Sequence, residues 1–146
     1  MRHTFLLVSA FCLAGCAPTS HLLDAGSPTA SFAPCPLPPR CATTIVGGGG
    51  RGGDVLPPIE TGLDPTAAHE RLRSVIAADD RFRVLSDDGR YLHTEFTTRR
   101  MRYKDDVEFL IRDDGRIDVR SAGRIGWYDW ETNRRRIEAL RADLAP

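Results

Sequence analysis

The stretch VEFLIRDDGRIDVR, residues 107–120, predicts a β-hairpin, because two apolar-rich runs flank the turn sequence Asp113-Asp114-Gly115. A three-residue loop that closes in a left-handed glycine brings the apolar residues of both strands onto one face. A two-residue loop would instead place Phe109 opposite Arg120, since a slip of one residue turns every side chain to the other face. We therefore expect the three-residue loop, with the pairs Ile111–Ile117, Phe109–Val119 and Glu108–Arg120.

The same turn sequence occurs earlier in the chain, as Asp87-Asp88-Gly89-Arg90, again between two apolar-rich runs. It predicts a second hairpin by the same rule. The expected pairs are Val84 with Leu92, Phe82 with Thr94, and Arg83 with His93. The two hairpins together predict four antiparallel strands.

Alternation along these strands assigns their side chains to two faces. The face expected to point into the core holds Phe82, Val84, Leu92, Phe96, Val107, Phe109, Ile111, Ile117 and Val119. The opposite face is mostly polar and holds Arg83, Tyr91, His93, Glu95, Asp106, Glu108, Asp118 and Arg120. The apolar face requires a covering layer.

Two helices are expected to cover it. Asp64 is a natural N-cap and Pro65 suits the first helical position, so a helix should begin there and end near residues 79–80. A second helix is expected over about residues 130–144, with an inward stripe of Asn133, Ile137, Leu140 and Leu144. The predicted fold class is α+β, in the order α-β-β-β-β-α: a four-stranded antiparallel sheet of two hairpins with an N-terminal and a C-terminal helix packed on one face. A short extra strand is expected near residues 58–60.

The N-terminus resembles a bacterial export signal, with a short basic start and an apolar run over residues 4–13 that is too short to span a bilayer. The following Leu13-Ala14-Gly15-Cys16 resembles the lipobox of bacterial lipoproteins. We therefore expect a lipoprotein signal peptide over residues 1–15 and lipidation at Cys16; the alternative is an ordinary cleavable signal. By analogy with the sorting rule of enteric lipoproteins, Ala17 favours the outer membrane, facing the periplasm.

Residues 16–56 are rich in Ser, Thr, Pro, Ala and Gly, and the glycine tract at residues 47–53 predicts a flexible, lipid-anchored tether. Cys35 and Cys41 predict a disulfide-closed loop within it, because an even pair of cysteines persists as a disulfide in an oxidising compartment. A zinc site is the alternative, but it would lack two of its four ligands. The globular domain is expected over residues 57–146.

Charge is balanced over the whole chain, which has 20 basic and 20 acidic residues. Together with export, this balance argues against a nucleic-acid partner, because nucleic-acid binding depends on a net basic surface.

The segment RSAGRIGWYDWETNRRRI, residues 120–137, is rich in arginine. Helix solubility, the flanks of the last helix and a cross-strand pair with Glu108 account for most of these arginines. The functional alternative is that some of them converge on a ligand, because a guanidinium group matches phosphate or carboxylate well. The candidate ligand-binding residues are Arg120, Arg124, Asn133, Arg134 and Arg136.

Aromatic and basic residues also suggest an interaction surface. Residues 127–130 form an aromatic cluster that is typical of interfaces if it is exposed, and part of the core if Trp130 packs under the last helix. Residues 99–104 form a basic segment that suits anionic headgroups; the alternative is a solvated connection between the hairpins. The candidate surface comprises Trp127, Tyr128, Arg99, Arg100 and Arg102.

Several short motifs occur in a characteristic order between residue 35 and the C-terminus. They are Cys35-Pro36 with Pro39 and Cys41, then Asp105-Asp106-Val107-Glu108-Phe109, then Arg120-Ser121-Ala122 with Arg124 and Gly126, and finally Asp129 with Asn133-Arg134-Arg135-Arg136-Ile137. In these motifs the chain resembles domain-of-unknown-function family 1499, small exported or envelope-linked bacterial domains with plant plastid relatives. The resemblance implies a domain type and an envelope location, not a reaction.

These features predict a cell-envelope lipoprotein that is anchored in the membrane by its lipid. We expect it to act as a non-enzymatic binding or interaction module, for an anionic or lipid ligand or for an envelope protein. No catalytic residue, cofactor or metal is assigned. The alternative is a small periplasmic hydrolase or metal-dependent enzyme that uses His93 and Glu95, which share one face of a strand.

Overall fold

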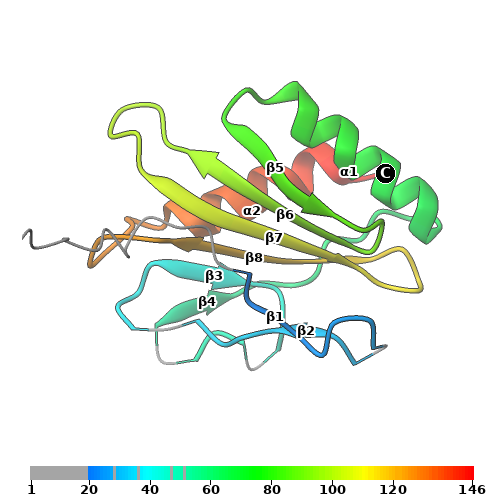
Figure 1. Ribbon diagram of the computed structural model, residues 1–146, viewed down its shortest axis with the longest axis horizontal. Coiled ribbons are helices and arrows are strands. Elements are labelled where there is room, and N and C mark those ends of the chain that lie inside the picture. The colour runs from blue at the N-terminus through cyan, green and yellow to red at the C-terminus, as the bar shows by residue number, and fades with distance from the viewer. Residues whose placement is uncertain (1–19, 28, 36, 47, 51) are drawn as a thin grey trace, which may run out of the picture.

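The computed structural model describes residues 20–146 except residues 28, 36, 47 and 51. A six-stranded sheet dominates the fold, with the strand order β4-β3-β8-β7-β6-β5 (Figure 1). All neighbours are antiparallel except the parallel pair β3–β4. The strands of this sheet are β3 (Cys41–Thr43), β4 (Gly53–Val55), β5 (Phe82–Asp87), β6 (Tyr91–Thr97), β7 (Lys104–Ile111) and β8 (Ile117–Gly123). The remaining elements are β1 (Leu22–Leu23) paired with β2 (Ser31–Phe32), and the helices α1 (Pro65–Ala78) and α2 (Thr132–Leu144).

The prediction of a four-stranded sheet is wrong, because the chain described here has eight strands and is predominantly β. Strands β3 and β4 extend the sheet beyond β8, and β1 and β2 form a separate pair. All four come from the segment that we expected to be a flexible tether, including part of its glycine tract. An uncovered β8 would have presented unpaired backbone groups, and pairing with β3 satisfies them. Two- and three-residue strands show no readable alternation, so the sequence pattern did not reveal them.

The register of the β7–β8 hairpin is confirmed: Phe109 lies opposite Val119, Ile111 opposite Ile117, and Glu108 opposite Arg120. Gly115 takes the expected left-handed conformation, with a φ of 78°. The turn and the apolar alternation agree here, and their agreement determines the pairing.

The register of the β5–β6 hairpin differs from the prediction. Phe82 pairs with Phe96 rather than Thr94, and a bulge between Val84 and Ser86 shifts the register. The shift brings the Phe82 and Phe96 rings to 4.8 Å in an edge-on contact. Val84 is 39% exposed, so its predicted core position is wrong. One extra residue at an edge strand leaves no trace in the alternation pattern.

Both helices occur close to their expected positions. The Asp64 carboxylate accepts hydrogen bonds from the backbone N–H groups of Thr66 and Ala67, as an N-cap should. Helix α2 begins at Thr132 rather than near residue 130, and its inward stripe is buried as predicted. The short strand expected near residues 58–60 is a single bridge between Ile59 and Ile117.

The two faces of the sheet are covered by different parts of the chain. Helices α1 and α2 cover the apolar face, and the segment that contains β1 and β2 lies against the opposite face (Figure 1). Ala30 and Phe32 pack there on Tyr91 and Leu110. The predicted disulfide between Cys35 and Cys41 is present and packs on Ala122. The polar face of the sheet is therefore an interior layer over β6, β7 and β8, whereas Arg83 on the edge strand β5 is exposed.

No helix in the described part of the chain is long and apolar enough to cross a membrane. Cys16 and the predicted signal peptide lie outside the described residues.

The two Asp-Asp-Gly-Arg turns provide a matched test of this architecture. Both Gly89 and Gly115 have positive φ, but a Cβ on Gly89 would meet nothing, whereas a Cβ on Gly115 would overlap the backbone oxygen of Leu63. We expect Gly89→Ala to cost about 1–2 kcal/mol, the usual penalty of a left-handed alanine. Gly115→Ala should cost clearly more, because the chain before α1 must also move. Urea unfolding curves measure both values, and equal costs would contradict the close approach of Leu63 to the turn.

Candidate functional site

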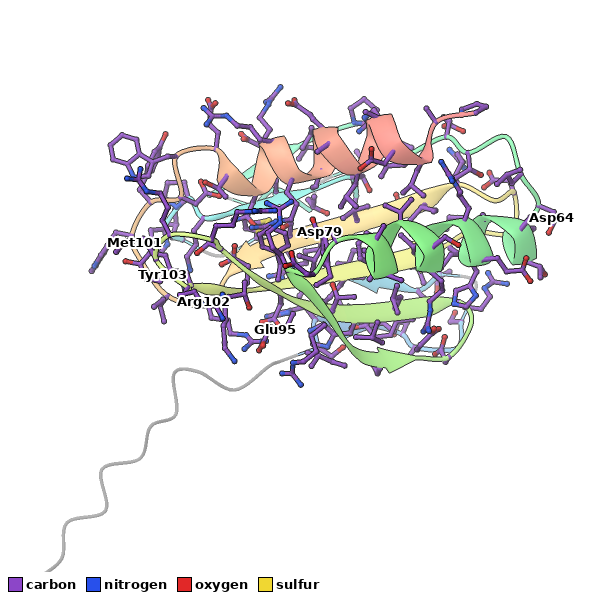
Figure 2. The ribbon with its side chains drawn as sticks, turned by 90° about the horizontal axis from the view of Figure 1, so that it is seen from above. Asp64, Asp79, Glu95, Met101, Arg102 and Tyr103 are labelled. Atoms are coloured by element: carbon purple, nitrogen blue, oxygen red, sulfur yellow. A yellow bond between two sulfur atoms is a disulfide. The ribbon has the colours of Figure 1, made fainter. Side chains whose placement is uncertain are left out.

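A groove of about 940 Å³ lies at one end of the sheet, between the β6–β7 turn and the loop that joins β8 to α2. Met101, Arg102 and Tyr103 of the turn mark this end in Figure 2, far from Asp64 at the start of α1. The groove is lined by parts of the turn, the loop, the residues that follow α1, and α2 from Thr132 to Asp143. It is larger than a second cavity of about 480 Å³ beside Leu22 and Tyr91, and its lining mixes apolar, basic and acidic side chains.

Aromatic side chains form much of the groove wall. Trp127 is 85% exposed and Trp130 is 76% exposed, and the rings of Tyr128 and Trp130 meet edge-on at 5.4 Å. Trp130 therefore does not pack under the last helix. Phe96 lies at the base of the groove, where it is buried. This combination provides apolar surface for a ligand from the base to the rim.

Arg136 is held rigidly at the base. Its guanidinium group donates hydrogen bonds to Asp105 at 2.6 Å and to Ser121 and Asn133 at 2.6 Å each, and it lies 3.9 Å above the Phe96 ring. Burial lowers the pKa of Arg136, although the Asp105 carboxylate opposes this effect. Its buried Nε has no hydrogen-bond partner among the described residues. These contacts make Arg136 a structural part of the groove floor.

Asn133 connects this floor to the loop above it. Its side-chain amide donates to the backbone oxygen of Arg40 at 2.8 Å and to the Asp129 carboxylate at 2.6 Å. Its carbonyl oxygen accepts from Ser121 at 2.7 Å. Asp129 also accepts from the backbone N–H of Asn133, so one carboxylate joins the loop to the first turn of α2. Asn133 thus shapes the groove and is itself buried.

The arginines that are available to a ligand lie in the β6–β7 turn. Arg99 and Arg100 are exposed, line the groove and form no close ion pair with any residue that the structure describes. By contrast, Arg81 pairs with Asp79 at 2.6 Å. The turn itself is braced, because Thr98 and Tyr103 exchange hydrogen bonds of 2.9 Å. These two arginines are therefore presented from a defined backbone, and Arg99 also contributes to lowering the pKa of Asp79.

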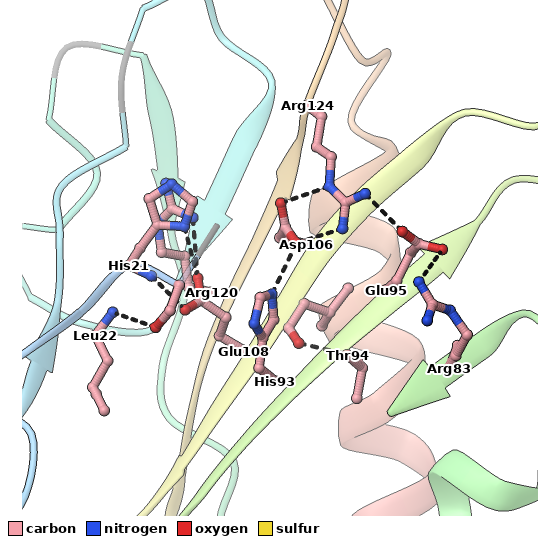
Figure 3. Close-up of polar contacts among 12 residues, drawn as sticks. His21, Leu22, Arg83, His93, Thr94, Glu95, Asp106, Glu108, Arg120 and Arg124 are labelled. Atoms are coloured by element: carbon pink, nitrogen blue, oxygen red, sulfur yellow. Dashed lines mark hydrogen bonds and ion pairs between the residues drawn. The ribbon is translucent and has the colours of Figure 1, made fainter. Parts of the chain in front are cut away.

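Arg124 lies elsewhere, in a second cluster on the covered polar face of the sheet (Figure 3). Its guanidinium group donates to Asp106 at 2.9 and 2.8 Å and to Glu95 at 2.6 Å. His93 contacts the same Asp106 at 2.8 Å. Burial alone would raise the pKa of Asp106, but the hydrogen bonds from Arg124 and His93 outweigh it and lower this pKa to about 2. The pKa of Glu95 is shifted in the same way. Burial would raise it, but hydrogen bonds from Lys104, Arg124 and Arg83 outweigh this effect and lower the pKa to about 2.

Arg120 belongs to a neighbouring cluster on the same face. It lies 3.3 Å from Glu108, and both side chains are essentially inaccessible to solvent. Glu108 also accepts from the Tyr91 hydroxyl at 2.6 Å and from the backbone of His21 at 2.7 Å. Arg134, in contrast, is exposed on α2 and pairs with Glu138. Of the five candidate ligand-binding residues, only Arg136 lines the groove, and Asn133 is buried beside it, where it accepts a hydrogen bond from Arg136.

His93 and Glu95, the residues of the alternative enzyme hypothesis, are both buried. Each is engaged by neighbouring charges, and no group of side chains in the described residues has the composition of a metal site. The geometry thus offers no open approach for a substrate to either residue.

Comparison with known proteins identifies the domain. The profile of the family described as "Protein of unknown function (DUF1499)" matches residues 31–144. The chain belongs to the DUF1499 family. No curated protein and no solved structure matches it significantly. The family match begins at Ser31, so strands β2, β3 and β4 are part of the DUF1499 domain.

Sequence reasoning missed several residues that build the groove in this DUF1499 domain. Phe96 was expected in the core, but not beneath a guanidinium group, and Asp105 and Arg40 were not assigned to the site. Asp129 lies just before α2, where the first backbone N–H groups of a helix need acceptors, and this local signal points to its contact with Asn133. Arg40 carries no comparable local signal, because it reaches the groove from a distant segment of the chain.

The Arg124 cluster predicts a specific dependence of stability on pH. The folded-state pKa values of Glu95 and Asp106 lie below their unfolded values of about 4, so their stabilisation is complete above about pH 5 and is lost as pH falls towards 2. Arg124→Met should cost about 3 kcal/mol at neutral pH, because it leaves two buried carboxylates with fewer partners. It should also flatten the decline in stability between pH 5 and pH 3.

Urea midpoints at pH 7, 5 and 3 measure both effects. Arg116→Met is a matched control, because Arg116 pairs with Asp114 at an exposed turn and its loss should leave the midpoints nearly unchanged. A decline with the same slope in Arg124→Met and in the unmodified chain would show that Arg124 does not control the two carboxylates.

Proposed function

We propose that this DUF1499 protein is a lipid-anchored envelope protein whose groove binds an anionic amphiphile, a molecule with an apolar chain and a negatively charged headgroup. The observation that carries the proposal is the meeting, in one groove, of exposed aromatic walls and two exposed arginines, Arg99 and Arg100, that form no close ion pair with a described residue. The aromatic walls match the apolar chain of such a ligand, and the arginines match its negatively charged headgroup.

The apolar half of the ligand is supported by the size and surface of the groove. A volume of about 940 Å³ lies within the range of small-molecule sites in proteins. Phe96, Leu140 and the two tryptophans supply apolar contact from base to rim. Burial of apolar surface contributes roughly 25 cal/mol per Å², so a short acyl or prenyl chain would gain substantially from these contacts.

The anionic half is supported by the charges. The groove is lined by six arginines and four aspartates, and Asp79 and Asp105 are already paired with Arg81 and Arg136. Arg99 and Arg100 remain for a ligand, and guanidinium groups bind phosphate and carboxylate through paired hydrogen bonds. A negative headgroup at the mouth of the groove would meet these two cations first.

The proposed location rests on the N-terminal sequence. We propose that Cys16 carries the lipid and that the domain faces the periplasm from the outer membrane. The Cys35–Cys41 disulfide supports an oxidising compartment. In that location, the anionic amphiphile that we propose is an envelope lipid or a fragment of one.

Intrinsic fluorescence tests the proposal directly, because the only two tryptophans of the chain, Trp127 and Trp130, both line the groove. The protein used is residues 20–146, which contain every described helix and strand, and it is produced by export to the periplasm so that the disulfide forms. It is then titrated with monomeric dodecyl phosphate. We expect saturable binding with a blue shift of the emission. Arg99→Gln with Arg100→Gln should weaken binding at least about tenfold, since a charge-assisted hydrogen bond contributes about 1.5–3 kcal/mol.

Two controls define the outcome. Arg90→Gln with Arg116→Gln removes two arginines from the turns at the opposite ends of the strands and should leave the affinity unchanged. Dodecyl trimethylammonium, which has the same chain and the opposite charge, should bind weakly. An absence of saturable binding, or an equal loss in the control variant, would refute the proposed function.

A further inference from the structure

We infer that the rim of the groove is a membrane-docking surface for an anionic bilayer. In this arrangement Trp127, Trp130 and Met101 enter the headgroup region, and Arg99, Arg100 and Arg102 contact lipid phosphates. The inference rests on the proposed function, because it names the bilayer itself as the source of the amphiphile. Its decisive residue, Arg102, lies outside the groove lining, so the two ideas are tested separately.

The apolar part of the rim comes from both loops that border the groove. Trp127 and Trp130 belong to the β8–α2 loop, and Met101, which is 64% exposed, belongs to the β6–β7 turn. Ile125 and Tyr103 are also exposed beside them. A concentration of large apolar side chains on a surface marks an interaction site. Tryptophan in particular favours the boundary between headgroups and acyl chains, where its ring is apolar and its N–H remains hydrated.

The basic part of the rim selects an anionic partner. Arg99, Arg100 and Arg102 are exposed within four consecutive residues of one turn. Each arginine near an anionic bilayer contributes about 1 kcal/mol. The same charges disfavour a second copy of this chain as the occupant, since two such turns would repel each other.

The backbone of both loops is held in a conformation that presents these side chains outward. Arg102, Trp130 and Glu131 have φ values of 56°, 55° and 60°, in the left-handed region that residues other than glycine rarely adopt. Only one other non-glycine residue in the described chain, Asp24, does so. Such conformations persist where surrounding contacts enforce them. Binding to a flat surface would therefore require little further ordering of the loops.

The distance along the chain to the proposed lipid places the domain against the membrane. Ser20, the first described residue, contacts the Tyr91 hydroxyl at 2.7 Å, so the chain is attached to the domain from this point. Three residues lie between it and Cys16, so the four chain steps reach at most about 14 Å when extended. A domain held so closely must rest one surface near the headgroups, and the aromatic and basic rim has the matching chemistry.

Sedimentation with vesicles tests the inference. Residues 20–146 are mixed with vesicles of phosphatidylcholine alone or with about a third phosphatidylglycerol, an anionic surface that attracts polybasic segments. We expect co-sedimentation with the anionic vesicles only, accompanied by a blue shift of tryptophan emission. Removing all three arginines with Arg99→Gln, Arg100→Gln and Arg102→Gln should weaken vesicle binding about a hundredfold.

The single variant Arg102→Gln separates docking from ligand binding. It should weaken vesicle binding severalfold and leave the affinity for monomeric dodecyl phosphate unchanged. Binding of dodecyl phosphate without any binding to anionic vesicles would overturn the docking surface and leave the proposed function standing. Equal binding to neutral and anionic vesicles, or a concentration-dependent dimer that the tryptophan variants Trp127→Ser and Trp130→Ser abolish, would also overturn it.

Discussion

The buried pairing of Glu108 with Arg120 is the interaction on which the rest of the fold depends. The two residues lie on the middle strands of the sheet, on the face opposite the helices, and neither reaches solvent. Removing one partner of such a pair typically costs about 3–5 kcal/mol, because the other charge is left buried. Glu108 also accepts hydrogen bonds from His21 and Tyr91. One carboxylate therefore joins the N-terminal segment to the centre of the sheet.

This pairing explains how a sheet can be covered on both faces when one face is polar. Burial of unpaired charges would be prohibitively costly, and the charges on this face are matched with one another, as Arg124 is with Glu95 and Asp106. The backbone of the covering segment takes part as well, since Ala33 accepts from Arg120. With both faces covered, a groove of mixed chemistry lies at the end of the strands. The proposed binding and docking roles are located there for that reason.

The predictions from sequence succeeded where two local signals agreed. The β7–β8 register followed from turn chemistry and apolar alternation together, and the start of α1 followed from Asp64 and Pro65. They failed where a single residue or a short segment decided the outcome. The bulge after Val84 shifted the β5–β6 pairing, and strands such as β3 are too short to show a period. The candidate site was predicted in part: the aromatic and basic loops were recognised, but their meeting in one groove was not.

The sequence by itself determined the β7–β8 hairpin with its register, both helices, the disulfide and the membership in the DUF1499 family, because each of these depends on residues close together in the chain or on motifs in a defined order. Only the tertiary structure decided which arginines are committed to internal carboxylates and which remain available at the surface. The sequence does not distinguish the partners of Arg124 from those of Arg99. In the structure, Arg124 is held between Glu95 and Asp106, whereas Arg99 lines an open groove. The physical reason is that an ion pair depends on distance in space, and strand pairing brings together charges that lie far apart along the chain.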